Sequence, residues 1–592
     1  MSSSTLRLCT LIGVVVALLQ FLSLTRTISN KQNERASRPA RRLPNDVSEA
    51  PSLAKAKAAD QAAAQDAANE AAAAAEESEK RAARLKASEE ELCVFWASTG
   101  ECEANPRYMN AKCGKECSVL ARLAHREEDR PALITRFVKN LHGAFAAVRP
   151  PGFGLRNDPH RATDAKIWEI YHAAIERLLG SSEYASLRVN EAIVRKDDSV
   201  FVSISSFRDD VCPDTLENLY ATASDPALIS VGLVQQNCDQ GQHDSFGCWS
   251  AVMPSDMRVH AIEADVDCRD AYCARANAYH GACHGGLLRV LRFNESETFG
   301  PVFGRYLGSM LWEGEAFYMQ VDAHTTFARG WDAVLRDDYA LAPSEKPLFS
   351  HYPPSGPQRP FLRPDGAPHA WERAPGPCMC SAAFAEYDIV RIGAMQQFPY
   401  KQFHPAGCVP SGPFDEECRR VPRHAPFVGA GFVFVRGDFI SQVPFDPYLP
   451  FIFMGEELDF AARAWTAGWD TFCPPRSAVA HAYVRPQRPK FWGALQRSFG
   501  AGAHNSLQQY VLARVKHLVG YPEARHTQQL DAPSLASHFD LYGLGSQRPL
   551  SDYLRLADLD FISKKPATSK WCQAGDAPPK TPAWPPKTPA WR

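Results

Sequence analysis

The chain has almost no net charge, because 65 Lys and Arg residues stand against 67 Asp and Glu residues and leave a formal charge of −2 at pH 7. A surface that holds nucleic acid usually needs a basic field, so no nucleic-acid partner is expected. Hydrophobic residues make up 45% and charged residues 22% of the 592 positions, which excludes a wholly disordered, collagen-like or multispanning chain. At roughly 150 residues per domain, this length suggests two to four domains.

The 17 cysteines mostly lack the paired two-residue spacing of zinc ribbons. Cysteines in this number are typical of an oxidising compartment, where they form disulfides. We therefore expect the folded part of the chain to lie in the secretory pathway.

A membrane anchor is predicted at residues 8–24, LCTLIGVVVALLQFLSL, which carry no charge. The run approaches the roughly 20 residues of a membrane helix, and it lacks a clear small-residue cleavage site. A cleaved signal peptide is the alternative. Six basic residues between positions 26 and 42 follow the run and only Arg7 precedes it, which by the positive-inside rule would place the bulk of the chain in the cytoplasm. The cysteines favour the opposite orientation, so we expect a single-pass protein of the Golgi or ER membrane with the large portion of the chain in the lumen.

Residues 54–87 contain 17 alanines and no Gly or Pro, a composition typical of a solvated helical spacer. A dimerising coiled coil is the alternative, but no Leu or Ile heptads support it. Residues 93–117 follow with four cysteines, for which two disulfides are expected and zinc is the alternative. This segment resembles part of a ShK-toxin-like domain at Trp96 and at residues 100–102, 105–106 and 108–109. That family normally has six cysteines, so its pairing is not carried over. We expect a structural or partner-binding module.

A parallel α/β arrangement is predicted further on. Residues 199–206 form a β-branched apolar run, a helix is expected from Pro213 to Ala223, and residues 228–235 form a second apolar run. In open sheets of this kind, ligands bind beyond the carboxyl ends of the strands. The side chains at that edge are nucleotide-binding candidates, namely Ser205, Arg208 and Asp209.

Another predicted strand, residues 315–321, ends in Asp322-Ala323-His324. At a strand end, residues 322 and 324 point the same way, and a carboxylate with an imidazole suits a divalent ion. Alone, such a triplet is more often a surface or capping feature. Glu456 and Glu457 begin a predicted helix, where they either face a ligand or merely complement the helix dipole. His481 follows an apolar strand and would ordinarily be a packed core histidine.

Four separated blocks carry a family resemblance across about 350 residues. The chain resembles the GlcNAc-transferase family that includes the protein-hydroxyproline N-acetylglucosaminyltransferase and, more distantly, polypeptide GalNAc-transferases. The blocks are VSISSFRDDVCPDTLENLY from Val202, FGPVFGRYLGSMLWEGEAFYMQVDAH from Phe299, GEELDFAARAWTAGWD from Gly455 and YGLGSQRPLSDY from Tyr542.

The resemblance implies a GT-A fold, which is an α/β Rossmann-like sheet flanked by helices, with UDP-GlcNAc as donor and Mn or Mg as the divalent cation. It implies that Asp322, His324 and His481 bind the metal and that Asp322 also contacts the nucleotide. Glu456 and Glu457 match donor or acceptor carboxylates that orient sugar hydroxyls, and Arg305 matches a nucleotide-side residue.

Related enzymes retain the anomeric configuration, and the resemblance implies that the leaving phosphate takes the acceptor proton, so no general base is assigned. The expected acceptor is a hydroxyl of a protein or peptide, on hydroxyproline or on Ser/Thr. The alternative is a catalytically inactive carbohydrate-binding or scaffolding membrane protein with the same fold.

The chain departs from this pattern at one insertion, and three further local features accompany it. Residues 267–286 form a cysteine-rich insertion, for which disulfides from Cys268, Cys273 and Cys283 are expected and zinc binding is the alternative. Asn294 begins a sequon that could carry a glycan only if exposed. Residues 343–377 hold ten prolines and are predicted to form an irregular loop near the acceptor side, and the tail repeats PKTPAW.

The predicted organisation is an anchor at 1–27, a helical stem at 28–92, a cysteine module at 93–120, a helical linker at 121–195, a glycosyltransferase domain at 196–565 and a Pro-rich tail at 566–592.

Overall fold

The computed structural model divides the chain into two compact units, residues 1–86 and 87–592, and all described residues belong to the second. It describes residues 93, 105–113, 130–145, 163–238, 249–250, 260–261, 265–357, 368–373, 377–395, 422–484, 490–499, 503–525, 532–564 and 571–572. The predicted anchor, the alanine-rich stem and the PKTPAW repeats lie outside these ranges. Within them, no helix combines the length and the apolar character that a bilayer span requires.

The described chain is organised around an eight-stranded mixed sheet with the order β11-β13-β8-β12-β6-β1-β2-β5. Strands β1, β2, β5 and β6 run parallel, whereas β12 runs antiparallel to both of its neighbours. The strands are β1 (Val200–Phe207), β2 (Ile229–Asn237), β5 (Leu288–Asn294), β6 (Phe317–Asp322), β8 (Pro347–Ser350), β11 (Arg423–His424), β12 (Phe432–Arg436) and β13 (Asp470–Cys473). The predicted parallel strands at residues 199–206 and 228–235 are thus confirmed.

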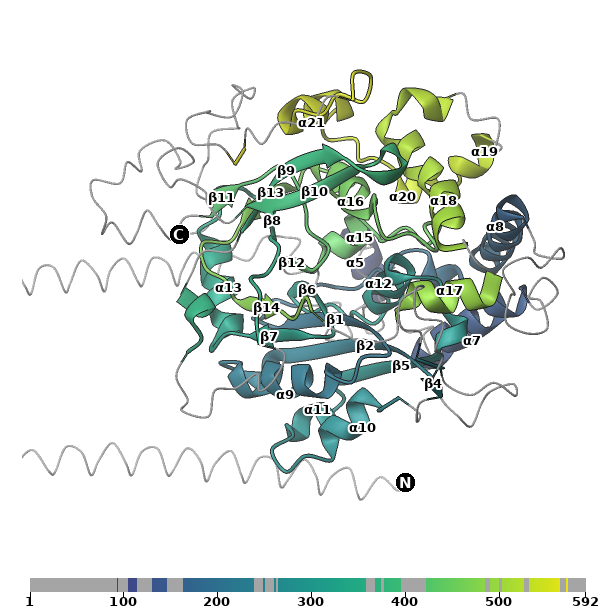
Figure 1. Ribbon diagram of the computed structural model, residues 1–592. Coiled ribbons are helices and arrows are strands. Elements are labelled where there is room, and N and C mark those ends of the chain that lie inside the picture. Colours follow the sequence, from purple (N-terminus) through teal and green to yellow (C-terminus); the bar gives the residue numbers. More distant parts are fainter. Residues whose placement is uncertain are drawn as a thin grey trace, which may run out of the picture. The chain divides into compact units, whose positions relative to one another are not determined.

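Helices pack on both faces of this sheet (Figure 1). They are α7 (Arg130–Gly143), α8 (Asp164–Gly180), α9 (Cys212–Thr222), α10 (Cys268–Cys273), α11 (His280–His284), α12 (Pro301–Ser309), α13 (Trp331–Ala340), α15 (Phe439–Gln442), α16 (Glu456–Thr466), α17 (Phe491–Phe499), α18 (Ala503–Val519), α19 (Ala532–Leu535), α20 (Phe539–Tyr542) and α21 (Leu550–Ala557). A short helix, α5 (Pro106–Lys112), lies in the cysteine module.

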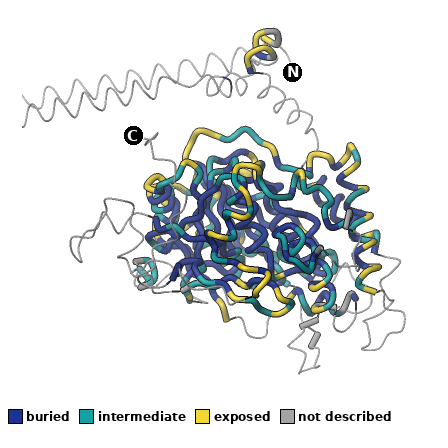
Figure 2. The backbone as a smooth tube through the Cα atoms, turned by 90° about the horizontal axis from the view of Figure 1, so that it is seen from above, coloured by how far each residue is buried: buried dark blue, intermediate teal, exposed yellow. Residues whose placement is uncertain are grey.

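Alternation along β1 explains why two layers of helices are needed. Val202 and Ile204 pack in the cluster that contains Leu216 of α9, whereas Phe201 packs in the cluster that contains Phe303 of α12. Side chains of a strand point alternately to its two faces, so an apolar run such as β1 must be covered on both sides. Figure 2 shows the buried residues that result, in dark blue, through the middle of this unit.

Glycines let α12 approach β1 closely. A Cβ atom at Gly304 would collide with the Ser205 hydroxyl, and one at Gly308 would collide with the Ser203 hydroxyl. A side chain at either position would therefore push the helix away from the strand. The close approach brings Arg305 of α12 to the edge of the sheet where β1 and β6 end.

Three small sheets complete the strands. They are β7 (Thr325–Phe327) with β14 (Val479–His481), β9 (Cys378–Phe384) with β10 (Val390–Met395), and β3 (Trp249–Ser250) with β4 (His260–Ala261).

The proline-rich region corrects one prediction, because residues 347–350 form strand β8 inside the main sheet rather than an irregular loop. Pro347 is the first residue of this strand, a position at which a missing N–H group is tolerated. Local composition therefore misled the prediction over these four residues. Residues 358–367 of the same region lie outside the described ranges.

Disulfides hold the insertion at residues 267–286, as expected. Cys268 is bonded to Cys212 of α9, and Cys273 is bonded to Cys283. The alternative of zinc binding by these cysteines is wrong, since their sulfurs are already paired. The other described disulfides are Cys93–Cys113, Cys378–Cys473 and Cys380–Cys572.

Asn294 is buried, so the condition for glycosylation at its sequon is not met in the folded chain. Its side-chain oxygen accepts a hydrogen bond from the Ser296 N–H at 2.9 Å and caps a short turn.

Candidate functional site

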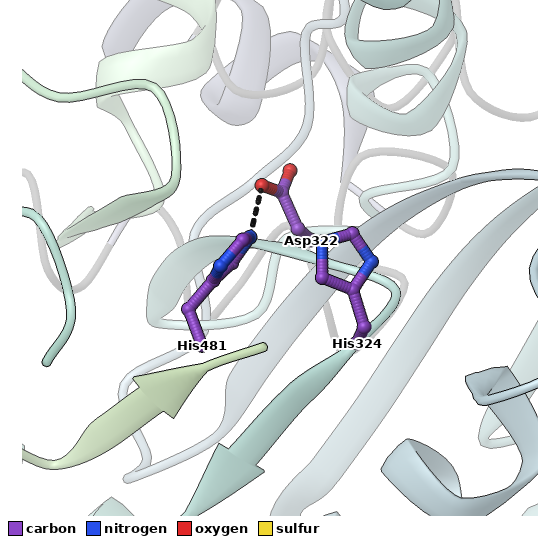
Figure 3. A group of neighbouring side chains, drawn as sticks. All are labelled: Asp322, His324 and His481. Carbon is purple, nitrogen blue, oxygen red and sulfur yellow. Dashed lines mark hydrogen bonds and ion pairs between the residues drawn. The ribbon is translucent and has the colours of Figure 1, made fainter. Parts of the chain in front are cut away.

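Three predicted metal ligands meet at the carboxyl edge of the sheet. Asp322 is the last residue of β6, His324 follows in the turn before β7, and His481 ends β14. Their ligand atoms all lie within 4.8 Å of one another. Figure 3 shows the carboxylate of Asp322 directed to the imidazole of His481, with the ring of His324 beside it. The Asp322 Oδ2 to His481 Nε2 distance is 3.0 Å.

Backbone pairing brings His481 to this place from far along the chain. In the antiparallel pair of β7 and β14, His481 lies opposite Thr325. The His481 N–H donates to the Pro354 carbonyl at 2.9 Å, and its carbonyl accepts from the Gly356 N–H at 3.0 Å. Because the His481 backbone is paired on both sides, the Cα atom that carries the imidazole is held in place beside Asp322.

Asp209 orients His324. Its Oδ2 lies 2.8 Å from His324 Nδ1, and its Oδ1 accepts a hydrogen bond from the Val211 N–H at 3.0 Å. A carboxylate that holds one ring nitrogen of a histidine is the usual outer partner of a metal-binding imidazole. The sequence predicted that Asp209 contacts the nucleotide. In the structure it is hydrogen-bonded to His324, a candidate metal ligand.

Arg305 connects the candidate metal ligands to the start of α16. Its guanidinium pairs with Glu456 and lies 3.5 Å from Asp322 Oδ1. Burial opposes the charge on Asp322, but the hydrogen bond with His481 and the charge of Arg305 outweigh it and hold the pKa of Asp322 well below its usual range. Burial alone would lower the pKa of Arg305, whereas the two carboxylates raise it. The edge therefore presents a permanently charged Asp322.

Glu457 has a different environment from Glu456, although the two are adjacent in α16. Its Oε1 accepts hydrogen bonds from the Tyr352 hydroxyl at 2.7 Å and from the Ala430 N–H at 2.9 Å. Burial is the main cause that raises the pKa of Glu457 to about 7, and these two donors offset only part of that effect. The carboxylate can therefore change its charge in the physiological range.

The remaining predicted residues lie at the same edge. Ser205 is opposite Asp322 in the pairing of β1 with β6, and its hydroxyl accepts a hydrogen bond from the Gln236 side chain at 3.3 Å. Arg208 is fully buried and pairs with Asp265 and Glu295. Any contact of Arg208 with a nucleotide would have to compete with these two carboxylates.

Sequence reasoning missed Tyr352 and the Ala430 N–H. Tyr352 follows β8 in a proline-rich stretch, where nothing in its neighbours marks it as a site residue. A backbone N–H carries no sequence signal at all. Tyr352, which follows β8, and Ala430, which precedes β12, reach Glu457 at the start of α16 through these hydrogen bonds.

The donor set fits a divalent ion. One carboxylate and two imidazoles match the preferences of Mn and Zn, and an outer carboxylate on His324 is in place. Asp322, His324 and His481 would hold the ion, which would supply positive charge for a diphosphate.

Comparison with known proteins identifies the family. A sequence model of the family described as Glycosyltransferase (GlcNAc) matches residues 199–563 of the chain. The chain belongs to this GlcNAc glycosyltransferase family. This membership supports a sugar-transferase activity, and it confirms the resemblance of the four sequence blocks at the level of a GlcNAc glycosyltransferase family.

Similarity to individual proteins is more limited. The crystal structure of GalNAc-T7 with UDP, GalNAc and Mn2+ has a TM-score of 0.35 and 15% identity, covering 71% of this chain and 69% of that chain. The structure of S. aureus TarS 1-349 has a TM-score of 0.23 and 10% identity, covering 58% of this chain and 80% of that chain. Conotoxin Im14.3 of Conus imperialis is 68% identical over 25 residues, or 4% of this chain. The matched stretch covers 34% of the length of that curated relative.

Proposed function

We propose that this GlcNAc glycosyltransferase family member is a metal-dependent retaining enzyme with a GT-A fold. It moves GlcNAc from UDP-GlcNAc to a hydroxyl of a protein or peptide, on hydroxyproline or on Ser/Thr. The observation that carries the proposal is the convergence of Asp322, His324 and His481 within 4.8 Å, although His481 lies 159 residues from Asp322 in the sequence.

The charges at the sheet edge suit the proposed donor. A nucleoside diphosphate gathers negative charge as the glycosidic bond breaks, and groups that stabilise that charge accelerate the reaction. Asp322, His324 and His481 would hold a divalent ion, and that ion would supply this stabilisation. Arg305 pairs with Glu456 and helps to keep Asp322 charged, and Glu456 and Glu457 accept hydrogen bonds from hydroxyls of the donor sugar or the acceptor.

The cellular setting belongs to the same proposal. The described disulfides support an oxidising compartment, and we place the catalytic domain in the lumen of the Golgi or the ER. The anchor is residues 8–24, and the cysteine module at residues 93–120 binds a partner or serves as structure.

The proposal is tested with purified protein and a panel of UDP-GlcNAc, UDP-GalNAc and UDP-glucose. After chelation, each donor is supplied with and without Mn, and donor hydrolysis and transfer to hydroxyproline and Ser/Thr peptides are measured. We expect UDP-GlcNAc to be the preferred donor and Mn to restore activity. The anomeric configuration of the product, read by NMR, tests retention.

Asp322→Ala and His324→Ala are the decisive variants, and Asp438→Ala is the matched control. The side chain of Asp322 is 30% exposed and that of Asp438 is 28% exposed, and each contacts an arginine. Activity that survives in both site variants would remove this site from the reaction. A wild-type protein that binds the nucleotide sugars and turns over none of them would instead favour the inactive carbohydrate-binding alternative.

A further inference from the structure

The contacts of Tyr352 with Glu457 are unusual because one hydroxyl reaches both oxygens of one carboxylate. The Tyr352 Oη atom lies 2.7 Å from Glu457 Oε1 and 2.9 Å from Oε2. Tyr352 directly follows Ser350 and His351 at the end of β8, whereas Glu457 lies in the first turn of α16. A hydroxyl at this distance from an acidic side chain forms a strong, charge-assisted hydrogen bond when the carboxylate is ionised.

The backbone also holds this carboxylate. The Ala430 N–H donates to Glu457 Oε1 at 2.9 Å, and the Ala430 carbonyl in turn accepts from the Gln320 side chain at 2.6 Å. Gln320 belongs to β6, so the backbone at Ala430 is attached to the main sheet. Glu457 is therefore held by hydrogen bonds from two segments outside its own helix, one that follows β8 and one that precedes β12.

Both donors keep their protons under ordinary conditions. Burial first, and then the charge of Glu457, raise the pKa of Tyr352, so its hydroxyl remains a donor. A backbone N–H cannot titrate in this range. An ionised Glu457 can accept about four hydrogen bonds, and these donors leave part of its capacity for a ligand. The side chain is only half-buried, so a ligand can reach it.

We infer that Tyr352 is a positioning residue that, together with the Ala430 N–H, fixes the Glu457 carboxylate as an acceptor for a hydroxyl of the donor sugar. The inference rests on the proposed function, because it assigns the donor sugar to the site described above. It adds a residue that neither the sequence motifs nor the family match identifies. Tyr352 itself need not touch the sugar.

Several charged or titratable groups face this pair, and they set its pH response. Glu456 lies beside Glu457 on α16 and disfavours its ionised form, whereas Arg305 of α12 favours it. Tyr483, which follows β14, and Arg391 of β10 act on Tyr352. Removal of the Tyr352 hydroxyl takes away a hydrogen bond to the ionised form of Glu457. Ionisation of Glu457 then requires a higher pH.

The test is donor kinetics of Tyr352→Phe with UDP-GlcNAc from pH 6 to pH 9. At pH 7 we expect kcat/KM to fall about tenfold, the effect of losing one hydrogen bond to a charged group. The acidic limb of the pH profile should move up by about one unit, so that much of the lost activity returns near pH 9. Glu457→Gln should lose that limb altogether, since its amide cannot ionise.

Tyr553→Phe is the matched control, because Tyr553 is a buried tyrosine whose hydroxyl likewise donates a hydrogen bond, to the Pro426 carbonyl at 3.2 Å. Its profile should equal that of the wild type. The inference is overturned if Tyr352→Phe matches the wild type, or if it loses the same fraction of activity at every pH, which indicates a structural role only. A wild type that transfers no sugar from any nucleotide donor overturns the proposed function and the inference together, whereas an active wild type with an unaltered Tyr352→Phe profile overturns the inference alone.

Discussion

Two buried arginines lie at the same edge of the sheet, each between two carboxylates, and yet their surroundings differ. Arg208 pairs with Asp265 and Glu295, and its side chain has 0% exposure. Arg305 pairs with Glu456 and contacts Asp322, whose carboxylate is partly exposed.

The difference lies in what surrounds the carboxylates. Both carboxylate oxygens of Asp265 accept hydrogen bonds from Arg208, and Oδ2 also accepts one from the Cys238 N–H at 2.8 Å. This cluster therefore links the residue after β1 to the residue after β2. Asp322 instead faces two imidazoles. An arginine between two carboxylates is therefore not evidence of a ligand-binding site by itself. It indicates such a site only when one of the carboxylates can still accept a contact from a ligand.

The largest effect is expected for Asp322→Ala, which removes the carboxylate that distinguishes the Arg305 cluster. We expect kcat/KM to fall on the order of 10³-fold, because the stabilisation of leaving-group charge is lost. The temperature of thermal unfolding should fall only modestly, because Arg305 keeps its pair with Glu456 although the contact of Asp322 with His481 is lost. Steady-state kinetics with UDP-GlcNAc checks this, and a variant with near wild-type kinetics would make the two clusters equivalent.

Arg208→Met should mainly affect stability. It strands the carboxylates of Asp265 and Glu295 in a buried place, so the free energy of unfolding should fall by about 3 kcal/mol. Arg305→Met should lose less stability and more activity, because Asp322 can be partly hydrated. Urea unfolding of both variants at one pH measures the difference. Equal destabilisation by both would contradict the distinction.

Manganese should stabilise only a chain with an intact ligand set. At a free concentration 100 times its Kd, the ion should raise the free energy of unfolding by about 2.7 kcal/mol. Asp322→Ala should abolish this increase and Asp438→Ala should keep it. Thermal unfolding with and without Mn gives the answer without any assay of activity, and an increase retained in Asp322→Ala would place the ion elsewhere.

The smallest effect concerns Glu457. Burial raises its pKa from the ordinary 4.5 to about 7, so the folded chain keeps a proton that the unfolded chain releases between these values. This contribution to stability is complete below pH 4.5 and is lost as the pH rises through 7. As the pH rises from 4.5 to 8, the free energy of unfolding of Glu457→Gln should therefore increase by about 2 kcal/mol relative to that of the wild type. This amount allows for partial exposure of the carboxylate. Urea unfolding at several pH values measures it, and parallel pH curves for both proteins would contradict it.

Much of the framework could be predicted from local patterns. The apolar runs at β1 and β2, the proline in the first turn of α9 and the start of α16 at Glu456 follow from interactions over a few residues, and the structure confirms each. The spacing of Asp322 and His324 also belongs to this local information. Disulfide formation in the insertion was predicted from cysteine number, although the partner Cys212 was not.

Only the tertiary structure decided which distant side chains share an environment. His481 reaches Asp322 through the pairing of β14 with β7, and Tyr352 reaches Glu457 across 105 residues. Arg208 and Arg305 were both predicted to lie at the nucleotide, and only their burial among different partners separates them. Local preferences act over one or two turns of chain, whereas burial and charge pairing depend on contacts that form when remote segments pack together.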